Sequence, residues 1–149
     1  MKTYETGNQR FTVHKSVTYE ITDAMNQDHK HIETLLDALE KNPTRFQLQK
    51  LKFELEKHFL IEEKAIFELY YTEDEEDENL VPILMQQHKS ILEEINELNT
   101  EDILDITRLK TMLQKHSKLE DEKFYPKLDE ILTVERKEAM LERIQIRLR

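Results

Sequence analysis

The chain has 149 residues, a formal net charge of −10, a single glycine and no cysteine. This length is sufficient for one domain with its own hydrophobic core, and the negative charge argues against binding to a nucleic-acid backbone or to an anionic membrane surface. The absence of cysteine excludes disulfides, thiolate metal ligands and a cysteine nucleophile, and the scarcity of glycine and proline favours helices.

The N-terminal segment, residues 1–20, mixes polar and β-branched residues without a helical period, and we interpret it as an arm. It contains no apolar core of the kind that a secretion signal needs. No run in the chain approaches the roughly 20 apolar residues of a membrane-spanning helix. We therefore expect a cytoplasmic protein with neither nucleic acid nor membrane as a partner.

The first predicted helix covers residues 23–41, where apolar residues recur at spacings of three and four. A second helix is predicted to run to about residue 71, with Asn42 as its cap and the following proline in its first turn. Its apolar stripe contains two polar members, His58 and Glu62. An imidazole and a carboxylate thus occupy positions where the helical period predicts an apolar residue such as leucine.

The segment TEDEEDEN (72–79) contains no apolar residue and is predicted to be a solvated loop. Its last residue, Asn79, is the expected cap of the third helix. A fourth helix follows, and Pro126 is expected to kink or end it because proline lacks the N–H that a helix interior needs. Thr133 can cap a last helix over 134–147.

Together these segments predict an all-α fold, a four-helix bundle with up-down-up-down topology. The bundle would span residues 23–132, preceded by the arm and followed by a C-terminal helix within 133–149. Short connections inside each pair of helices make the paired helices antiparallel neighbours. We expect one domain over residues 1–149.

Each of the four long predicted helices carries one histidine within its own apolar stripe. The second helix of each pair adds a glutamate four residues after its histidine, on the same helical face. A rise of about 1.5 Å per residue places all four histidines roughly 20 Å from the turns at Asn42 and Thr100, and therefore at one level of the bundle. The six polar residues of this level are His29, His58, Glu62, His88, His116 and Glu120.

A dry core tolerates these residues only if something compensates the two carboxylates. Burying an ionised carboxylate without a partner is very unfavourable, and the stripes contain no lysine or arginine to neutralise the pair. Two cations would neutralise both glutamates, and six ligands suit a dinuclear site better than one tetrahedral zinc. A lone buried histidine is more often a hydrogen-bonded core residue, but four at one level favour metal ligation. We interpret His14 and His31 as surface residues.

Four segments carry a resemblance to a known family: DHKHIETLLDAL (28–39), HFLIEEKAIF (58–67), HKSIL (88–92) and HSKLEDEKFYPKL (116–128). In the order H…HxxxE…H…HxxxE the sequence resembles the hemerythrin-like, or HHE cation-binding, family, and in particular its bacterial members with four histidines and two glutamates. The resemblance implies a four-helix bundle with a non-haem di-iron centre. Two Fe ions, joined by an oxo or hydroxo bridge, would lie on the six positions named above.

Two positions distinguish the sequence from the oxygen-carrying hemerythrins it resembles. The carriers have a further histidine one turn after the ligand of the third helix, where this chain has Leu92. They also take their last carboxylate from an HxxxxD spacing, and HSKLED offers both Glu120 and Asp121. Glu120 fits the apolar stripe and repeats the spacing between His58 and Glu62, so we choose it and keep Asp121 as the alternative.

These features predict a di-iron protein that binds, senses or reacts with O2, NO or peroxide, because the absent fifth histidine leaves coordination positions open. We expect a metal- and gas-binding protein rather than a dedicated enzyme, acting as a monomer or homodimer with a small diatomic or peroxide ligand. Two alternatives stay open: iron–sulfur cluster repair or iron handling, and a bundle that its metal only stabilises. The repair protein that the family includes carries an additional cysteine-containing segment, and this sequence has no cysteine.

Overall fold

The computed structural model describes residues 20–69 and 80–148, and the regular secondary structure within these ranges is helical. Nearly all of the predicted arm, the acidic loop over 72–79 and the expected cap Asn79 lie outside the described residues. The helices are α1 (Ile21–Lys41), α2 (Arg45–Ile61), η1 (Glu62–Phe67), α4 (Val81–Glu97), α5 (Ile103–Leu119), η2 (Glu120–Phe124), α6 (Tyr125–Ile131) and α7 (Val134–Leu148). The segments η1 and η2 are π-helical and continue α2 and α5 directly.

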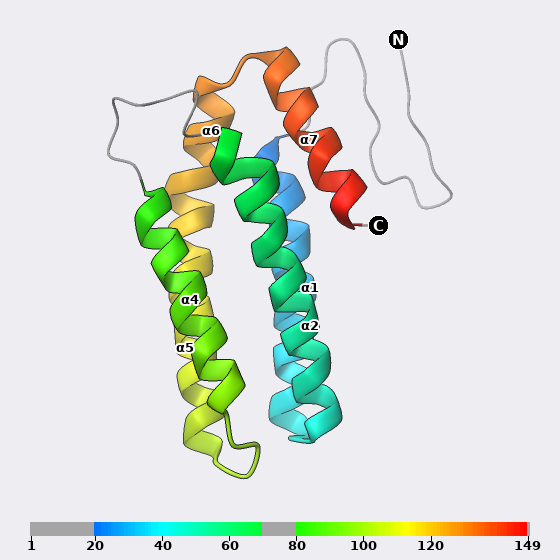
Figure 1. The fold of residues 1–149 in the computed structure, drawn as a ribbon, viewed down its shortest axis with the longest axis vertical. Helices are drawn as coiled ribbons and strands as arrows, with labels where there is room; N and C mark the ends of the chain where they lie inside the picture. The colour runs from blue at the N-terminus through cyan, green and yellow to red at the C-terminus, as the bar shows by residue number, and fades with distance from the viewer. Residues whose placement is uncertain (1–19, 70–79, 149) are drawn as a thin grey trace.

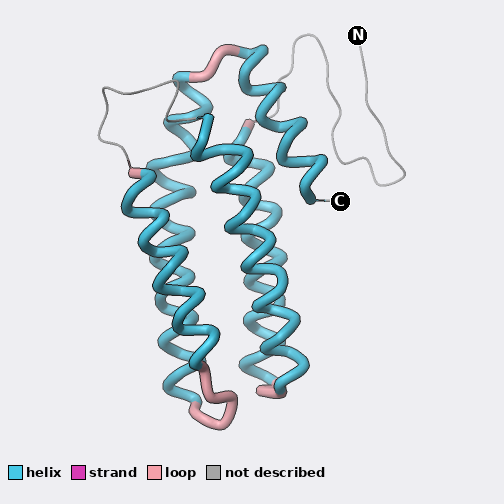
Figure 2. Tube along the Cα trace, in the orientation of Figure 1, coloured by secondary structure: helices cyan, strands magenta, loops and turns pink. Residues whose placement is uncertain are grey.

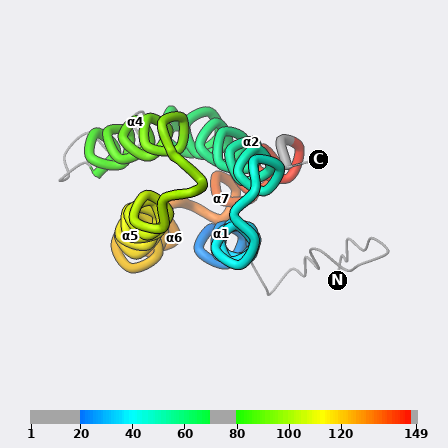
Figure 3. Tube along the Cα trace, turned by 90° about the horizontal axis from the view of Figure 1, so that it is seen from below, coloured from blue at the N-terminus to red at the C-terminus, as the bar shows by residue number. Residues whose placement is uncertain are grey.

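The predicted up-down-up-down bundle is confirmed and consists of α1, α2, α4 and α5 (Figure 1). Figure 2 shows the short connections that join α1 to α2 and α4 to α5 at the same end. Seen along its axis, the bundle places α1 beside α2 and α5 and diagonally opposite α4 (Figure 3). The helices α6 and α7 lie at the other end, where α1 begins. Within 20–69 and 80–148, no helix combines the length and apolar character that crossing a membrane requires.

The cap of α2 differs from the prediction, because Thr44 rather than Asn42 holds this position. The Thr44 side chain accepts a hydrogen bond from the Gln47 N–H at 3.1 Å. Asn42 instead ends α1, where its N–H donates to the Ala38 carbonyl at 2.9 Å. Three residues separate α1 from α2, so Pro43 lies in the turn and α2 begins after it.

The other predicted boundaries agree more closely with the helices. The turn near Thr100 is present, and Asp102 caps α5 by accepting a hydrogen bond from the Leu104 N–H at 2.9 Å. Pro126 lies in the first turn of α6, where the chain leaves the π-helical segment. The hydroxyl of Thr133 accepts from the Arg136 N–H at 3.2 Å and so caps α7 as expected.

Two apolar clusters form the core, one on each side of the predicted polar level. On α1, Met25 belongs to the cluster near α6 and α7, whereas Ile32 belongs to the cluster near the helix-joining turns. His29 lies between these two residues in the sequence. The polar side chains therefore form a layer inside the bundle, enclosed above and below by packed hydrocarbon.

Asp129, on α6, caps the first helix from a position more than 100 residues away in the sequence. Its carboxylate accepts hydrogen bonds from the Ile21 N–H at 2.6 Å, from the Thr22 N–H at 3.1 Å and from the Thr22 hydroxyl at 2.6 Å. The buried Lys137 of α7 lies 3.6 Å from the same carboxylate. These contacts connect the N-terminal end of α1 to α6 and α7.

We expect Asp129→Ala to lower the free energy of unfolding by about 2 to 3 kcal/mol. It would leave two helix N–H groups without their acceptor and a buried ammonium without one of its counter-charges. Urea denaturation of the purified variant would measure the loss. The matched control is Glu130→Ala, which removes the neighbouring, exposed carboxylate of the same helix. Equal stability of both variants would contradict a capping role.

Candidate metal centre

The six predicted polar residues converge in the middle of the bundle. Every one of them is at most 6 % exposed, and each comes from the helix that the sequence assigns to it. The residues are His29 on α1, His58 on α2, Glu62 on η1, His88 on α4, His116 on α5 and Glu120 on η2. The structure thus brings the whole set together, and the ligation of a metal by these residues stays a prediction.

Glu62 is the most central of the six. Its Oε1 lies 3.2 Å from His58 Nε2, 3.0 Å from His88 Nε2 and 3.8 Å from His116 Nε2. Glu120 occupies the equivalent position in the second helical hairpin. Its Oε1 lies 3.2 Å from both His29 Nε2 and His116 Nε2. Both carboxylates therefore face imidazole nitrogens from more than one helix.

Two groups of possible ligand atoms result from this geometry, each with its atoms within 4.8 Å of one another. The first group contains His29 and His58, and the second contains His88 and His116. Glu62 and Glu120 belong to both groups. The two groups are therefore adjacent, and both carboxylates lie where the groups meet.

Several buried atoms of this layer have no hydrogen-bond partner among the described residues. They are the Nε2 atoms of His29, His58 and His116 and both carboxylate oxygens of Glu120. Leaving buried polar atoms without partners is strongly unfavourable, and imidazole nitrogens with carboxylate oxygens are a common donor set for divalent metals. The chemistry of these residues therefore fits a bound cation.

The far side of each imidazole is hydrogen-bonded through Nδ1. Asp121 lies 3.1 Å from His29 Nδ1, and Asp28 pairs with His58 Nδ1. Glu63 lies 2.9 Å from His88 Nδ1, and the amide oxygen of Gln87 lies 2.7 Å from His116 Nδ1. These acceptors fix the proton on Nδ1 and leave Nε2 free to bind a metal.

Sequence reasoning missed this outer set of acceptors, although it named one of its members. Asp121, kept as an alternative ligand, belongs to neither group of ligand atoms and contacts His29 from the outside. A signal was present in the sequence, since each of the four acceptors is the immediate neighbour of one of the six central residues.

The π-helical segments begin at the two glutamates, η1 at Glu62 and η2 at Glu120. In η2 the Tyr125 N–H donates to the Glu120 carbonyl, an i to i+5 bond that places one extra residue in the turn. π-helical turns are rare and are found frequently at functional sites. Their matched occurrence in both halves gives the two carboxylates equivalent backbone settings.

Tyr125 is a further residue of the centre that the sequence did not reveal. Its side chain is fully buried, and its hydroxyl donates a hydrogen bond to Glu62 Oε2. Burial, together with the charges of Glu120 and Glu62, holds the pKa of the Tyr125 hydroxyl well above its usual value. The phenol therefore keeps its proton and remains a donor to the shared carboxylate.

The metal-free layer holds protons at neutral pH. Burial alone would lower the pKa of His29, but its contacts with Asp121 and Glu120 outweigh burial and raise that pKa to about 9. Burial also opposes protonation of His116, and the nearby carboxylates of Glu120 and Glu62 outweigh burial and raise its pKa to about 9. In the metal-free protein both imidazoles are therefore cations at pH 7.

Burial and nearby charges also have opposite effects on the pKa values of His58 and Glu62. Burial disfavours a charge on His58, but Glu62 and Asp28 raise its pKa well above the usual value. Burial would raise the pKa of Glu62, but His58 and the adjacent polar groups hold it well below the usual value. Protonated imidazoles thus compensate the carboxylates when no metal is bound, and a binding metal would displace these protons.

We expect the metal-free protein to lose stability as the pH rises from 6.5 to about 9. The pKa values of His29 and His116 are raised on folding, so their stabilisation is complete below the unfolded value of 6.5 and is lost as the pH rises through about 9. A rise of the pKa from 6.5 to about 9 corresponds to about 3 kcal/mol. Urea denaturation at pH 6 and at pH 9.5 would measure the change, and equal stability at both would contradict it. The metal-loaded protein, whose imidazoles are neutral, is the control.

The helical bundle with its buried layer of histidines and glutamates is that of a metal-binding four-helix protein. Residues 20–128 match the family model described as the hemerythrin HHE cation-binding domain, and the chain belongs to this family. The resemblance inferred from the sequence is thereby confirmed. No curated protein and no solved structure shows a significant match to the chain.

Proposed function

We propose that this protein holds two iron ions in its core and binds, senses or reacts with O2, NO or peroxide there. The observation that carries the proposal is the pair of ligand groups that share Glu62 and Glu120. Imidazole and carboxylate donors serve iron, manganese and zinc alike, and the choice of iron follows from membership of the hemerythrin family.

The protein supplies fewer ligands than two iron ions would need, which leaves coordination positions open for an external ligand. Each group offers four side chains, of which two are shared with the other ion. Octahedral iron takes about six donors, so positions remain for an external ligand. Leu92, which is partly buried, stands where oxygen-carrying hemerythrins have a further histidine and supplies no donor.

Bound iron would supply electron exchange with the small ligand, and the side chains around the centre would control its surroundings. The Phe59 ring stacks on His88 at a centroid distance of 3.9 Å, and the Phe67 ring lies 5.5 Å from the same imidazole. These rings exclude water from one side of the centre. Tyr125 keeps a proton beside Glu62, within reach of the shared carboxylate.

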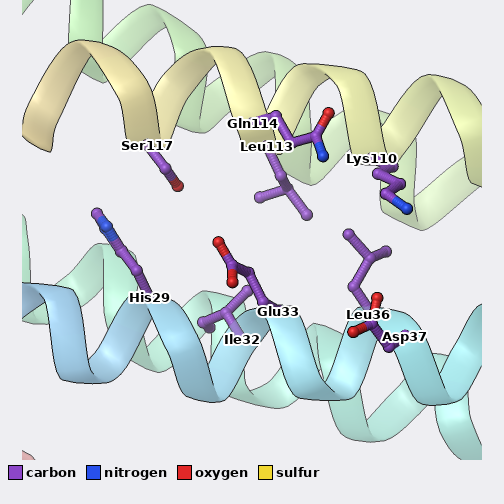
Figure 4. A pocket seen from close by; sticks show the side chains of 9 residues that line it. All are labelled: His29, Ile32, Glu33, Leu36, Asp37, Lys110, Leu113, Gln114 and Ser117. Carbon is purple, nitrogen blue, oxygen red and sulfur yellow. The ribbon is translucent and has the colours of Figure 1, made fainter.

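A cavity of about 230 Å³ between α1 and α5 supports access for small molecules (Figure 4). His29 lies at one end of it, and Ser117 faces His29 from α5. Glu33 follows along α1, on the side opposite Gln114, and Asp37 lies farther along, opposite Lys110. The cavity thus extends along the bundle surface and reaches an imidazole of the first ligand group.

The direct test is a titration of the anaerobic, iron(II)-loaded protein with NO and, separately, with O2 and peroxide. We expect at least one of them to produce a new visible absorption that saturates at a fixed ratio of ligand to protein. The zinc-loaded protein is the control and should show no such change. If none of the three ligands changes the absorption spectrum, the proposal is contradicted and a metal that only stabilises the bundle is favoured.

A further inference from the structure

The repeat that relates the two hairpins extends beyond the six central residues to the acceptors behind them. Glu63 follows Glu62 and accepts from His88, and Asp121 follows Glu120 and contacts His29. In each hairpin, therefore, the residue after the glutamate supports the first histidine of the other hairpin. Both of these residues are carboxylates.

The second pair of acceptors occupies equivalent places but differs in chemistry. Asp28 directly precedes His29 and pairs with His58 on the next helix, α2. Gln87 directly precedes His88 and accepts from His116 on the next helix, α5, at 2.7 Å. The repeat is therefore broken at one place, where a charged carboxylate in the first hairpin corresponds to a neutral amide in the second.

The difference between Asp28 and Gln87 affects the two ligand groups unequally. The histidines of the first ligand group, His29 and His58, are both supported by carboxylates. Of the histidines of the second group, His88 is supported by a carboxylate and His116 by the Gln87 amide. The first cation position thus has one more negative charge in its immediate surroundings than the second.

We propose that the two metal positions are unequal, and that Gln87 makes the position at His88 and His116 the weaker and more readily exchanged one. The inference rests on the proposed occupancy of the centre by two ions. A carboxylate behind an imidazole increases its basicity and adds an attractive charge for a cation, whereas an amide provides the hydrogen bond alone. Outer partners of this kind change metal affinity by about 10-fold to 100-fold when they are replaced.

Two single substitutions would restore the symmetry of the repeat from opposite directions. Gln87→Glu supplies the missing carboxylate and should strengthen the weaker position about tenfold. Asp28→Asn keeps an acceptor for His58 but removes its charge, and should weaken the stronger position by a similar factor. A gain of affinity in Gln87→Glu is the more informative result, because damage to the structure would cause a loss.

The experiment uses the full chain loaded with Co²⁺ and equilibrated with increasing concentrations of a chelator. Co²⁺ retained per chain and the visible absorption of the bound metal are recorded together. The wild-type protein should release its two ions in two steps separated by about tenfold in chelator concentration. Gln87→Glu should shift only the first step and Asp28→Asn only the second, so that the two steps merge in each variant.

Gln86→Glu is the matched control. It introduces the same charge one residue earlier, on an exposed side chain that hydrogen-bonds to Ser90 rather than to a histidine. An equal effect of Gln86→Glu, or release of both ions at one chelator concentration in wild type and in Gln87→Glu, would overturn the inequality and leave the two-ion centre intact. Binding of a single Co²⁺ per chain would instead overturn both.

Discussion

Replacing Glu62 with glutamine should abolish tight metal binding at both positions, with a loss of at least 100-fold in affinity. Glu62 belongs to both ligand groups, and its Oε1 faces imidazoles from three helices. Glutamine has nearly the same shape, but it brings no negative charge and its amide nitrogen cannot ligate a cation. The protein therefore loses one of the two ligand oxygens of this side chain and half of the charge that the two shared carboxylates provide.

Metal retained per chain after dialysis against a weak chelator would measure this effect. Glu63→Gln is the matched control, since it changes the adjacent carboxylate, which contacts the outer nitrogen of His88 and belongs to neither ligand group. We expect Glu63→Gln to weaken binding by about tenfold and to leave both positions able to bind. Retention of both ions by Glu62→Gln would show that Glu62 is not a shared ligand.

Removing the metal should lower the midpoint of thermal unfolding by about 15 to 30 °C. A ligand that binds only the folded state at about 1,000 times its dissociation constant adds about 4 kcal/mol, and two ions add twice that amount. For a chain of this length each kcal/mol shifts the midpoint by about 2 to 4 °C. The protonated imidazoles that replace the metal offset part of the loss, because they still compensate the carboxylates.

Differential scanning calorimetry of the loaded and the chelated protein would measure this shift. Re-addition of Fe²⁺ or Co²⁺ should restore the original midpoint, whereas Mg²⁺ should not, because it prefers oxygen donors to imidazole. Equal midpoints with and without metal would contradict a centre that binds strongly inside the folded bundle.

Helical periodicity predicted the bundle and the position of its polar layer, because both follow from which residues share a face. His58 and Glu62 stand out in the sequence since they occupy places that leucine should hold. The same reasoning placed His29, His88 and His116 at one level, where the structure brings them together. Periodicity is sufficient here because the four helices are long and their connections short.

Periodicity fails where the helix changes its geometry. Glu120 and Tyr125 are five residues apart and both fully buried, whereas a period of 3.6 residues places such positions about 140° apart around the helix. The i to i+5 bond from Tyr125 to Glu120 adds a residue to the turn and rotates Tyr125 toward Glu62. A π-helical turn has no sequence signature that could have indicated this.

Contacts between segments that are distant in the sequence could not be predicted from periodicity either. The capping of α1 by Asp129 depends on the placement of α6, which the spacing of residues does not encode. The cap of α2, by contrast, had a local signal. Thr44 and Gln47 form the first and last residues of a T-x-x-Q capping box, which favours Thr44 over Asn42.

Two cations are expected to lie between Glu62 and Glu120 in the core of this bundle. X-ray diffraction from crystals of the iron-loaded protein, measured on both sides of the iron absorption edge, tests this expectation most directly. We expect two anomalous peaks per chain, one beside His29 and His58 and the other beside His88 and His116. A single peak, or peaks only at surface carboxylates, would contradict it.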